Sequence, residues 1–128
     1  HPSYKPAAMS FRTHLESVVN QVDGALACSV MGFDGISVET LQKEEAADLE
    51  LNGTWVEYAN LLGQLRQAAE ALKTGEVQEV SVNSERVMTL MRLVSPEYFL
   101  ILALRTDGNY GKGRYVLRVI APKIRAEL

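Results

Sequence analysis

The chain has 128 residues, one cysteine and a formal net charge of −3 at pH 7. This length suits a single domain that buries enough surface to fold without disulfides or structural metals. The lone Cys28 cannot form an internal disulfide. The acidic balance gives no overall attraction to nucleic acid or to an anionic membrane, and no apolar run reaches the roughly 18 residues that span a bilayer. We therefore expect a cytosolic, single-domain protein that binds neither.

The first eight residues, HPSYKPAA, contain two prolines and no periodic apolar pattern. We interpret residues 1–8 as a leader foreign to the native chain, so the domain would cover residues 9–128. Ser10 is a candidate N-cap for a helix over residues 11–22, whose apolar side chains recur on one face. His14 lies off that face. A solvated helix histidine explains it better than a metal or catalytic role, because no second histidine or cysteine cluster accompanies it.

The next stretch predicts a β-hairpin. In residues 25–31, both the odd-numbered and the even-numbered side chains are small or apolar. This pattern is typical of a strand covered on both faces. An Asp-Gly turn at Asp34 leads into a return strand over residues 36–41. A turn explains Asp34 better than catalysis, and Cys28 is better explained as a core residue than as a nucleophile. Residues 42–53 are acidic and predict a surface connection, with an acidic docking surface as the alternative.

Residues 54–75 predict one long helix. Thr54 and Glu57 have the spacing of a capping box, and Gly75 lies where a residue with positive φ would end the helix. The apolar side chains cover an arc of roughly 180°, wider than the roughly 100° that a helix on one core needs. We infer that the helix contacts both its own sheet and a second subunit; burial on several sides within one domain is the alternative. The arc consists of Trp55, Tyr58, Ala59, Leu61, Leu62, Leu65, Ala69 and Leu72.

Three short strands follow, over residues 77–83, 87–94 and 98–105. The short turns between them make neighbouring strands antiparallel. The last strand is almost continuously apolar and should be central, whereas the first keeps polar side chains and is the best candidate for an exposed edge. The edge and the wide helix together predict one dimer surface. Its predicted residues are Trp55, Tyr58, Ala59, Leu62, Leu65, Arg66, Ala69, Val77, Glu79 and Ser81.

The glycine-rich loop over residues 106–113 leads into a last helix over residues 110–125, with Asn109 as its expected cap. The loop matches neither the Walker pattern nor the dinucleotide pattern, so a turn explains it better than nucleotide binding. Pro122 should kink this helix or end it early. A solvated face is the usual explanation of the arginines on one side of the helix. The alternative is a partner-binding stripe made of Arg114, Arg118 and Arg125.

The sequence offers no constellation for catalysis. No Ser/His/Asp set, no paired carboxylates and no His/Cys group with metal-ligand spacing can be assembled from it. We therefore expect a binding or assembly module without cofactor or metal, and not an enzyme. The expected α/β (α+β) order is α-β-β-α-β-β-β-α, a five-stranded antiparallel sheet with helices on both faces.

This order and three local sequences resemble the Roadblock family of the dynein light-chain superfamily. The matching stretches are GALACSVMGFDGISVET in the hairpin, ANLLGQLRQAAEAL in the long helix and DGNYGKGRYVLR at the last helix. The likeness covers residues 9–128. It implies a Roadblock domain that forms a homodimer, in which the central helices pack against one another and the edge strands join two sheets into one.

Bacterial Roadblock proteins commonly act beside Ras-like small GTPases, as in the Mgl system of cell polarity and gliding motility. The chain resembles the MglC-type adaptors of that system more than its MglB-type activators. The resemblance implies a non-catalytic regulator that binds another Roadblock protein, a Ras-like GTPase or a polarity protein. Two alternatives stay open. One is a GTPase-activating protein, which in this family repositions the GTPase's own residues; the other is a small-ligand sensing domain.

Overall fold

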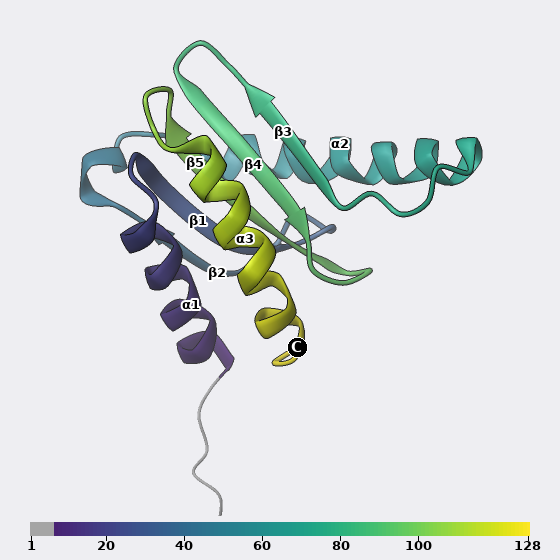
Figure 1. Ribbon diagram of the computed structural model, residues 1–128, viewed down its shortest axis with the longest axis horizontal. Helices are drawn as coiled ribbons and strands as arrows, with labels where there is room; N and C mark the ends of the chain where they lie inside the picture. The colour runs from purple at the N-terminus through teal and green to yellow at the C-terminus, as the bar shows by residue number, and fades with distance from the viewer. Residues whose placement is uncertain (1–6) are drawn as a thin grey trace, which may run out of the picture.

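The computed structural model describes residues 7–128 (Figure 1). Most of the proposed leader at residues 1–8 lies outside the described residues. Helix α1 (Ala7–Gln21) starts before the predicted boundary and contains Ser10, so the expectation that Ser10 caps this helix is wrong. Alanine has the highest helix propensity, which explains why the helix extends upstream through the alanine pair.

The order of the elements is the predicted one, with a short 3₁₀ turn added in the acidic connection. The five strands form one antiparallel sheet in the order β2-β1-β5-β4-β3, so the most apolar strand is central and β3 is an edge, as predicted. The remaining elements are β1 (Ala25–Gly32), β2 (Ser37–Gln42), η1 (Glu44–Ala46), α2 (Leu51–Leu72), β3 (Glu79–Asn83), β4 (Val87–Leu93), β5 (Tyr98–Arg105) and α3 (Tyr110–Arg125).

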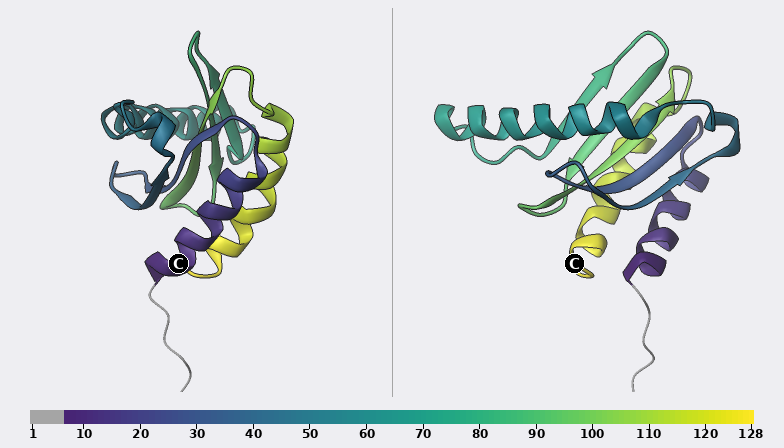
Figure 2. Two further views of the ribbon diagram at one scale, coloured as in Figure 1. Left: turned by 90° about the vertical axis from the view of Figure 1, so that its left-hand side faces the viewer. Right: turned by 180° about the vertical axis from the view of Figure 1, so that it is seen from behind.

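Helices cover both faces of the sheet. Helices α1 and α3 lie side by side on one face, and α2 crosses the opposite face (Figures 1 and 2). Each face has its own core: Phe11 and Ile124 belong to the cluster under α1 and α3, and Trp55 and Phe99 to the cluster under α2. Helix α2 is therefore separated from α1 and α3 by the thickness of the sheet.

Helix α2 begins and ends differently from the prediction. It starts at Leu51, so Thr54 is within the first turns, where its Oγ1 donates to the Glu50 carbonyl at 3.1 Å, and the predicted capping box is wrong. Leu51 packs against the core under α2, and this burial extends the helix upstream. At the other end Lys73 is the C-cap, with φ of 57°, and Gly75 (φ 92°) lies two residues beyond it.

The C-terminal helix matches its predicted bounds and its predicted cap. Asn109 Oδ1 accepts a hydrogen bond from the Lys112 amide at 3.0 Å. The expectation that Pro122 ends the helix early is wrong, because α3 continues to Arg125. Pro122 lies on the exposed side of the helix, and buried Ile124 anchors the last turn against the core.

The hairpin and the thiol behave as expected. Asp34 Oδ1 accepts from the Ile36 amide at 3.0 Å, which is the role of a turn residue. Cys28 is fully buried, and this burial raises the pKa of its thiol to about 12, so it remains a neutral core residue. The acidic connection is mostly exposed, with buried Ala46 as its anchor. None of the helices in residues 7–128 has the length and hydrophobicity of a membrane span.

Candidate protein interface

The inward face of α2 holds three of the predicted interface residues. Trp55, Ala59 and Leu62 are at most 1% exposed and belong to the core that α2 shares with the sheet. A second subunit could reach them only by displacing that core. The structure therefore assigns these three side chains to the fold of the single chain and not to a dimer contact.

The outward side of the same helix is apolar and open. Leu61, Leu65 and Leu72 are 51%, 45% and 73% exposed, and Ala68 lies between them. Their spacing places all four within about 60° of one another on the helix, and we call them the outward stripe. Leu65 was a predicted interface residue. Leu61 and Leu72 were missing from that prediction, although their place in the over-wide apolar arc was the signal that could have included them.

The reason for this exposure is visible in the arrangement of the elements. Helix α2 has 22 residues, a length of about 33 Å. Its N-terminal half lies over the sheet, whereas its C-terminal end extends past the body of the molecule (Figure 2). The sheet covers the side of the helix that carries Trp55, Ala59 and Leu62, whereas the outward stripe lies on the other side and faces solvent, with Leu72 on the overhanging end.

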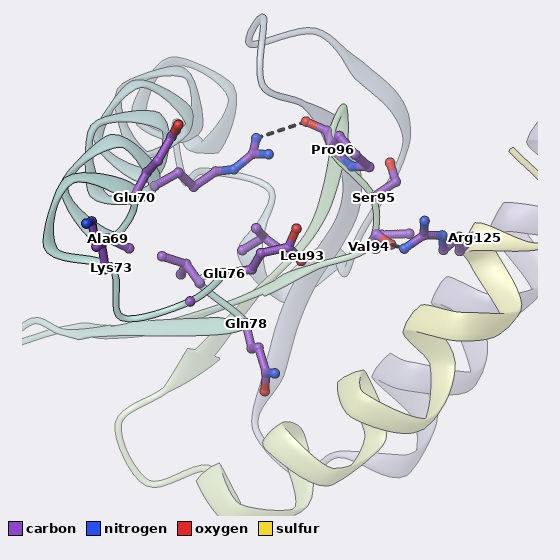
Figure 3. Close-up of a pocket in the computed structure, with 13 residues that line it drawn as sticks. Ala69, Glu70, Lys73, Glu76, Gln78, Leu93, Val94, Ser95, Pro96 and Arg125 are labelled. Carbon is purple, nitrogen blue, oxygen red and sulfur yellow. Dashed lines mark hydrogen bonds between the residues drawn. The ribbon is translucent and has the colours of Figure 1, made fainter.

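A cleft of about 560 Å³ opens between the C-terminal half of α2, the segment that connects α2 to β3, and the β4–β5 turn (Figure 3). The predicted interface residues Arg66, Ala69 and Val77 line it. Arg66 is turned towards its own chain: its Nη1 donates to the Pro96 carbonyl at 2.9 Å across the cleft. Ala69 and Val77 are half-buried, as is Tyr58 at the border of the outward stripe, so they lie at the rim of any contact made there.

The edge strand β3 pairs with β4, and in the described part of the chain no strand lies on its other side. Its predicted interface side chains point towards α3. Glu79 Oε2 accepts from Arg114 Nη2 at 2.7 Å, and Ser81 Oγ lies 2.9 Å from the Tyr110 hydroxyl. The edge can therefore offer its backbone groups to a partner strand, while Glu79 and Ser81 hold α3 against the sheet.

The three arginines of the predicted stripe each contact their own chain. Arg114 pairs with Glu79, and this hydrogen bond raises the pKa of Arg114 further above its ordinary value. The Arg118 guanidinium lies 5.8 Å from the Tyr115 ring centroid, and Arg125 Nη1 donates to the Val94 carbonyl at 3.5 Å. Arg125 lines the large cleft, whereas Arg114 and Arg118 line a smaller one, so the structure divides the stripe in two.

His14 has a structural contact. Its Nε2 lies 2.7 Å from Glu127 Oε2 and joins α1 to the end of the chain. Within residues 7–128 no three His, Cys, Asp or Glu side chains form a group that could hold a metal ion.

Comparison with solved structures places this geometry in a family. A Roadblock/LC7 domain from Streptomyces avermitilis matches with a TM-score of 0.77 at 12% identity, over 89% of this chain and 93% of that one. The crystal structure of MglC from Myxococcus xanthus is 81% identical over 94% of this chain and 100% of that one, with a TM-score of 0.68. The chain belongs to the Roadblock family.

The Roadblock fold of the chain also matches a structure described as MglB with tetrameric arrangement. That match has a TM-score of 0.86 at 16% identity and covers 98% of this chain and 92% of that one. At such identity it supports the Roadblock fold alone. Comparisons with protein-family models and with curated proteins gave no match.

Proposed function

We propose that this Roadblock protein works as a homodimeric, non-catalytic regulator or adaptor in a Ras-like GTPase pathway of the Mgl type, with a role in cell polarity and gliding motility. The observation that carries the proposal is the outward stripe. Three large side chains of one helix (Leu61, Leu65 and Leu72) are about half exposed or more, on a helix that extends past its own sheet. Exposed apolar patches of this kind mark contact sites between proteins.

A twofold axis beside α2 would bury the outward stripes of two chains against each other. In such a dimer every contact occurs twice, because the same patch lies on both subunits. Full burial of a leucine side chain contributes about 1.5–3 kcal/mol, so three half-exposed leucines on each of two chains offer several kcal/mol. The free edge of β3 follows α2 directly in the chain, and pairing of two such edges would add backbone hydrogen bonds to the same interface.

The dimer is tested by size exclusion with light scattering on Leu65→Arg. Leu65 is 45% exposed, so the arginine fits the single chain, but in a helix pair it would be desolvated without a partner. We expect the wild type to have the mass of two chains and the variant that of one, with unchanged circular dichroism. Ile36→Arg, at an exposed apolar residue of the β1–β2 turn (68% exposed), is the control and should remain dimeric. A monomeric wild type, or a Leu65→Arg variant that stays dimeric, contradicts the proposal.

The pathway is tested by adding purified partners. The sequence identity of 81% to MglC supports an Mgl-type role. A tetrameric arrangement has been described for MglB, so an MglB-type protein is one of the partners to test. We expect a heavier complex when an MglB-type protein or a Ras-like GTPase is added. Phosphate release from the GTPase should stay at its intrinsic rate, since an adaptor does not accelerate hydrolysis. Stimulated release would favour the GTPase-activating alternative, and indifference to both partners contradicts the pathway assignment.

A further inference from the structure

Helix α3 is strongly cationic in an acidic protein. Its 16 residues include five basic side chains and no acidic one, whereas the whole chain has a net charge of −3. Its apolar face is committed to the core through residues such as Val116, Leu117 and Ile120. The cations therefore lie on the sides of the helix that the chain itself does not cover. They are Lys112, Arg114, Arg118, Lys123 and Arg125.

Two apolar side chains interrupt this charged surface. Tyr115 and Val119, one turn apart on α3, are 52% and 40% exposed. Two cations flank the Tyr115 ring: Lys112 Nζ is 5.9 Å and the Arg118 guanidinium 5.8 Å from its centroid. Tyrosine and arginine are the side chains most enriched among residues that dominate protein–protein binding energy.

A shallow cleft of about 170 Å³ lies beside these residues, between α3 and the β3–β4 hairpin. Three arginines line it (Arg92, Arg114 and Arg118), together with Tyr115, and Glu79 is the single acid among the lining residues. Glu79 contacts Arg114 at 2.7 Å and Arg92 at 3.9 Å, so one carboxylate serves two guanidinium groups. The cleft carries an excess of positive charge with hydrogen-bond donors, which suits a second carboxylate.

We infer that this surface, which we call the α3 cleft, docks an acidic segment of another protein. A glutamate or aspartate of the partner enters between Arg92, Arg114 and Arg118, and apolar side chains beside it contact Tyr115 and Val119. The inference rests on the proposed adaptor function and names the chemistry of the partner. Arginine is suited to this role because its planar donors match a carboxylate bidentately.

The same features disfavour lipid and nucleic acid. Membrane-surface helices bury a broad apolar face in the lipid, and the apolar face of α3 is already used by the core, which leaves Tyr115 and Val119. Phosphate-rich polymers are attracted by extended positive potential, and outside α3 this protein is acidic. A short acidic peptide needs only the local charge of the cleft.

Glu79 acts in this arrangement as an internal competitor. Its carboxylate occupies the position that the partner's carboxylate would take beside Arg114. Glu79→Gln removes the negative charge with little change of shape. The docking surface should therefore bind an acidic peptide more tightly in this variant, whereas a purely structural Glu79–Arg114 pair would leave binding unchanged or weaken it.

The test uses a fluorescein-labelled octaglutamate peptide and measures anisotropy on the full chain at 0.15 M salt, where exposed charges are screened beyond about 8 Å. We expect Arg118→Ala and Arg114→Ala to weaken binding about tenfold each, since a charge-assisted hydrogen bond contributes about that factor. Glu79→Gln should tighten binding several-fold. Arg86→Ala, an equal charge loss at an exposed arginine of the β3–β4 turn, should stay within about twofold of wild type. Equal effects of Arg86 and Arg118, weaker binding by Glu79→Gln, or no binding would overturn the inference.

Further arms separate other ligands and the dimer. Tighter binding to vesicles of 70% phosphatidylcholine and 30% phosphatidylserine, or to single-stranded DNA, overturns the assignment to protein. A mass above the dimer that Arg118→Ala abolishes assigns the cleft to a second copy of the chain and overturns it also. The Leu65→Arg variant should bind the peptide with unchanged affinity, and Arg118→Ala should keep the oligomeric state of the wild type. Failure of the docking site and failure of the proposed dimer therefore give different results.

Discussion

The guanidinium of Arg66 lies 4.3 Å from the centroid of the Phe33 ring and also donates to the Pro96 carbonyl at 2.9 Å. Phe33 in turn tilts against Phe99, with 5.1 Å between ring centroids, and its amide donates to the Glu97 carbonyl at 3.0 Å. One side chain of α2 thus contacts the β1–β2 turn and the β4–β5 turn together. Both turns are held at the end of the sheet where the large cleft opens.

Arg66→Ala should lower the free energy of unfolding by about 1–2 kcal/mol. The variant loses a cation–π contact at a half-buried site and a hydrogen bond to a backbone carbonyl. Urea unfolding followed by circular dichroism measures this, with Gln67→Ala as the control because Gln67 is the exposed neighbour on the same helix. Equal midpoints for the two variants would show that Arg66 does not fasten the turns.

Leu62→Arg and Ala59→Arg should prevent folding, and not merely separate subunits. Both residues are at most 1% exposed, and a guanidinium placed there is buried without a carboxylate. Leu65→Arg, three residues from Leu62 on the outward stripe, is the matched control and should fold. Near-ultraviolet circular dichroism, which reports fixed aromatic packing, distinguishes the cases. A folded monomeric Leu62→Arg protein would mean that Leu62 faces a partner after all.

The difference between Leu62 and Leu65 shows what the sequence could and could not predict. Helical periodicity gives the angle at which a side chain leaves the helix, and it correctly predicted an apolar arc too wide for one sheet. It does not say which part of that arc faces the sheet, so it could not separate the buried side chains, such as Leu62, from the exposed ones, such as Leu65. The pairing of β1 with β2 and of β3, β4 and β5 in sequence was predictable because short turns constrain neighbouring strands.

The α3 cleft could not be predicted from the sequence, because its residues come from separate parts of the chain. The Arg114–Glu79 pair joins residues 35 positions apart, and only the packing of α3 on β3 brings them together. The signal available in the sequence was the composition of residues 110–125, with five cations and no acid. The capping-box spacing of Thr54 and Glu57 gave the wrong start for α2. The helix begins at Leu51, because this side chain packs against the core under α2.

Asn109→Ala should destabilise the fold by about 1 kcal/mol. Its side-chain oxygen accepts a hydrogen bond from the Lys112 amide at 3.0 Å, and loss of such a cap leaves a donor of the first turn unpaired. Thermal unfolding with Asn20→Ala, an exposed asparagine of α1, as the control would measure the difference. The melting temperature of the control should stay near that of the wild type, and an equal fall in both variants would argue against a capping role.

Stability should fall as the pH rises above 9, in part because of Cys28. Burial raises the pKa of this thiol from 9.0 to about 12, so between these values the unfolded chain loses a proton that the folded chain keeps. Each pH unit in this window costs about 1.4 kcal/mol of unfolding free energy. Urea unfolding at pH 8, 9 and 10 should show a steeper decline for the wild type than for Cys28→Ala, in which the other titrating groups are unchanged. Parallel declines would contradict this role for the thiol.

Helices α2 and α3 lie on opposite faces of the sheet (Figure 2). Two chains joined through α2 would therefore present two copies of α3, both turned away from the junction. A ligand with a pair of acidic stretches on a suitably long tether could occupy both at once, and its second attachment would be intramolecular. Dimerisation would then raise the overall affinity for such a ligand through avidity, although each individual contact stays weak.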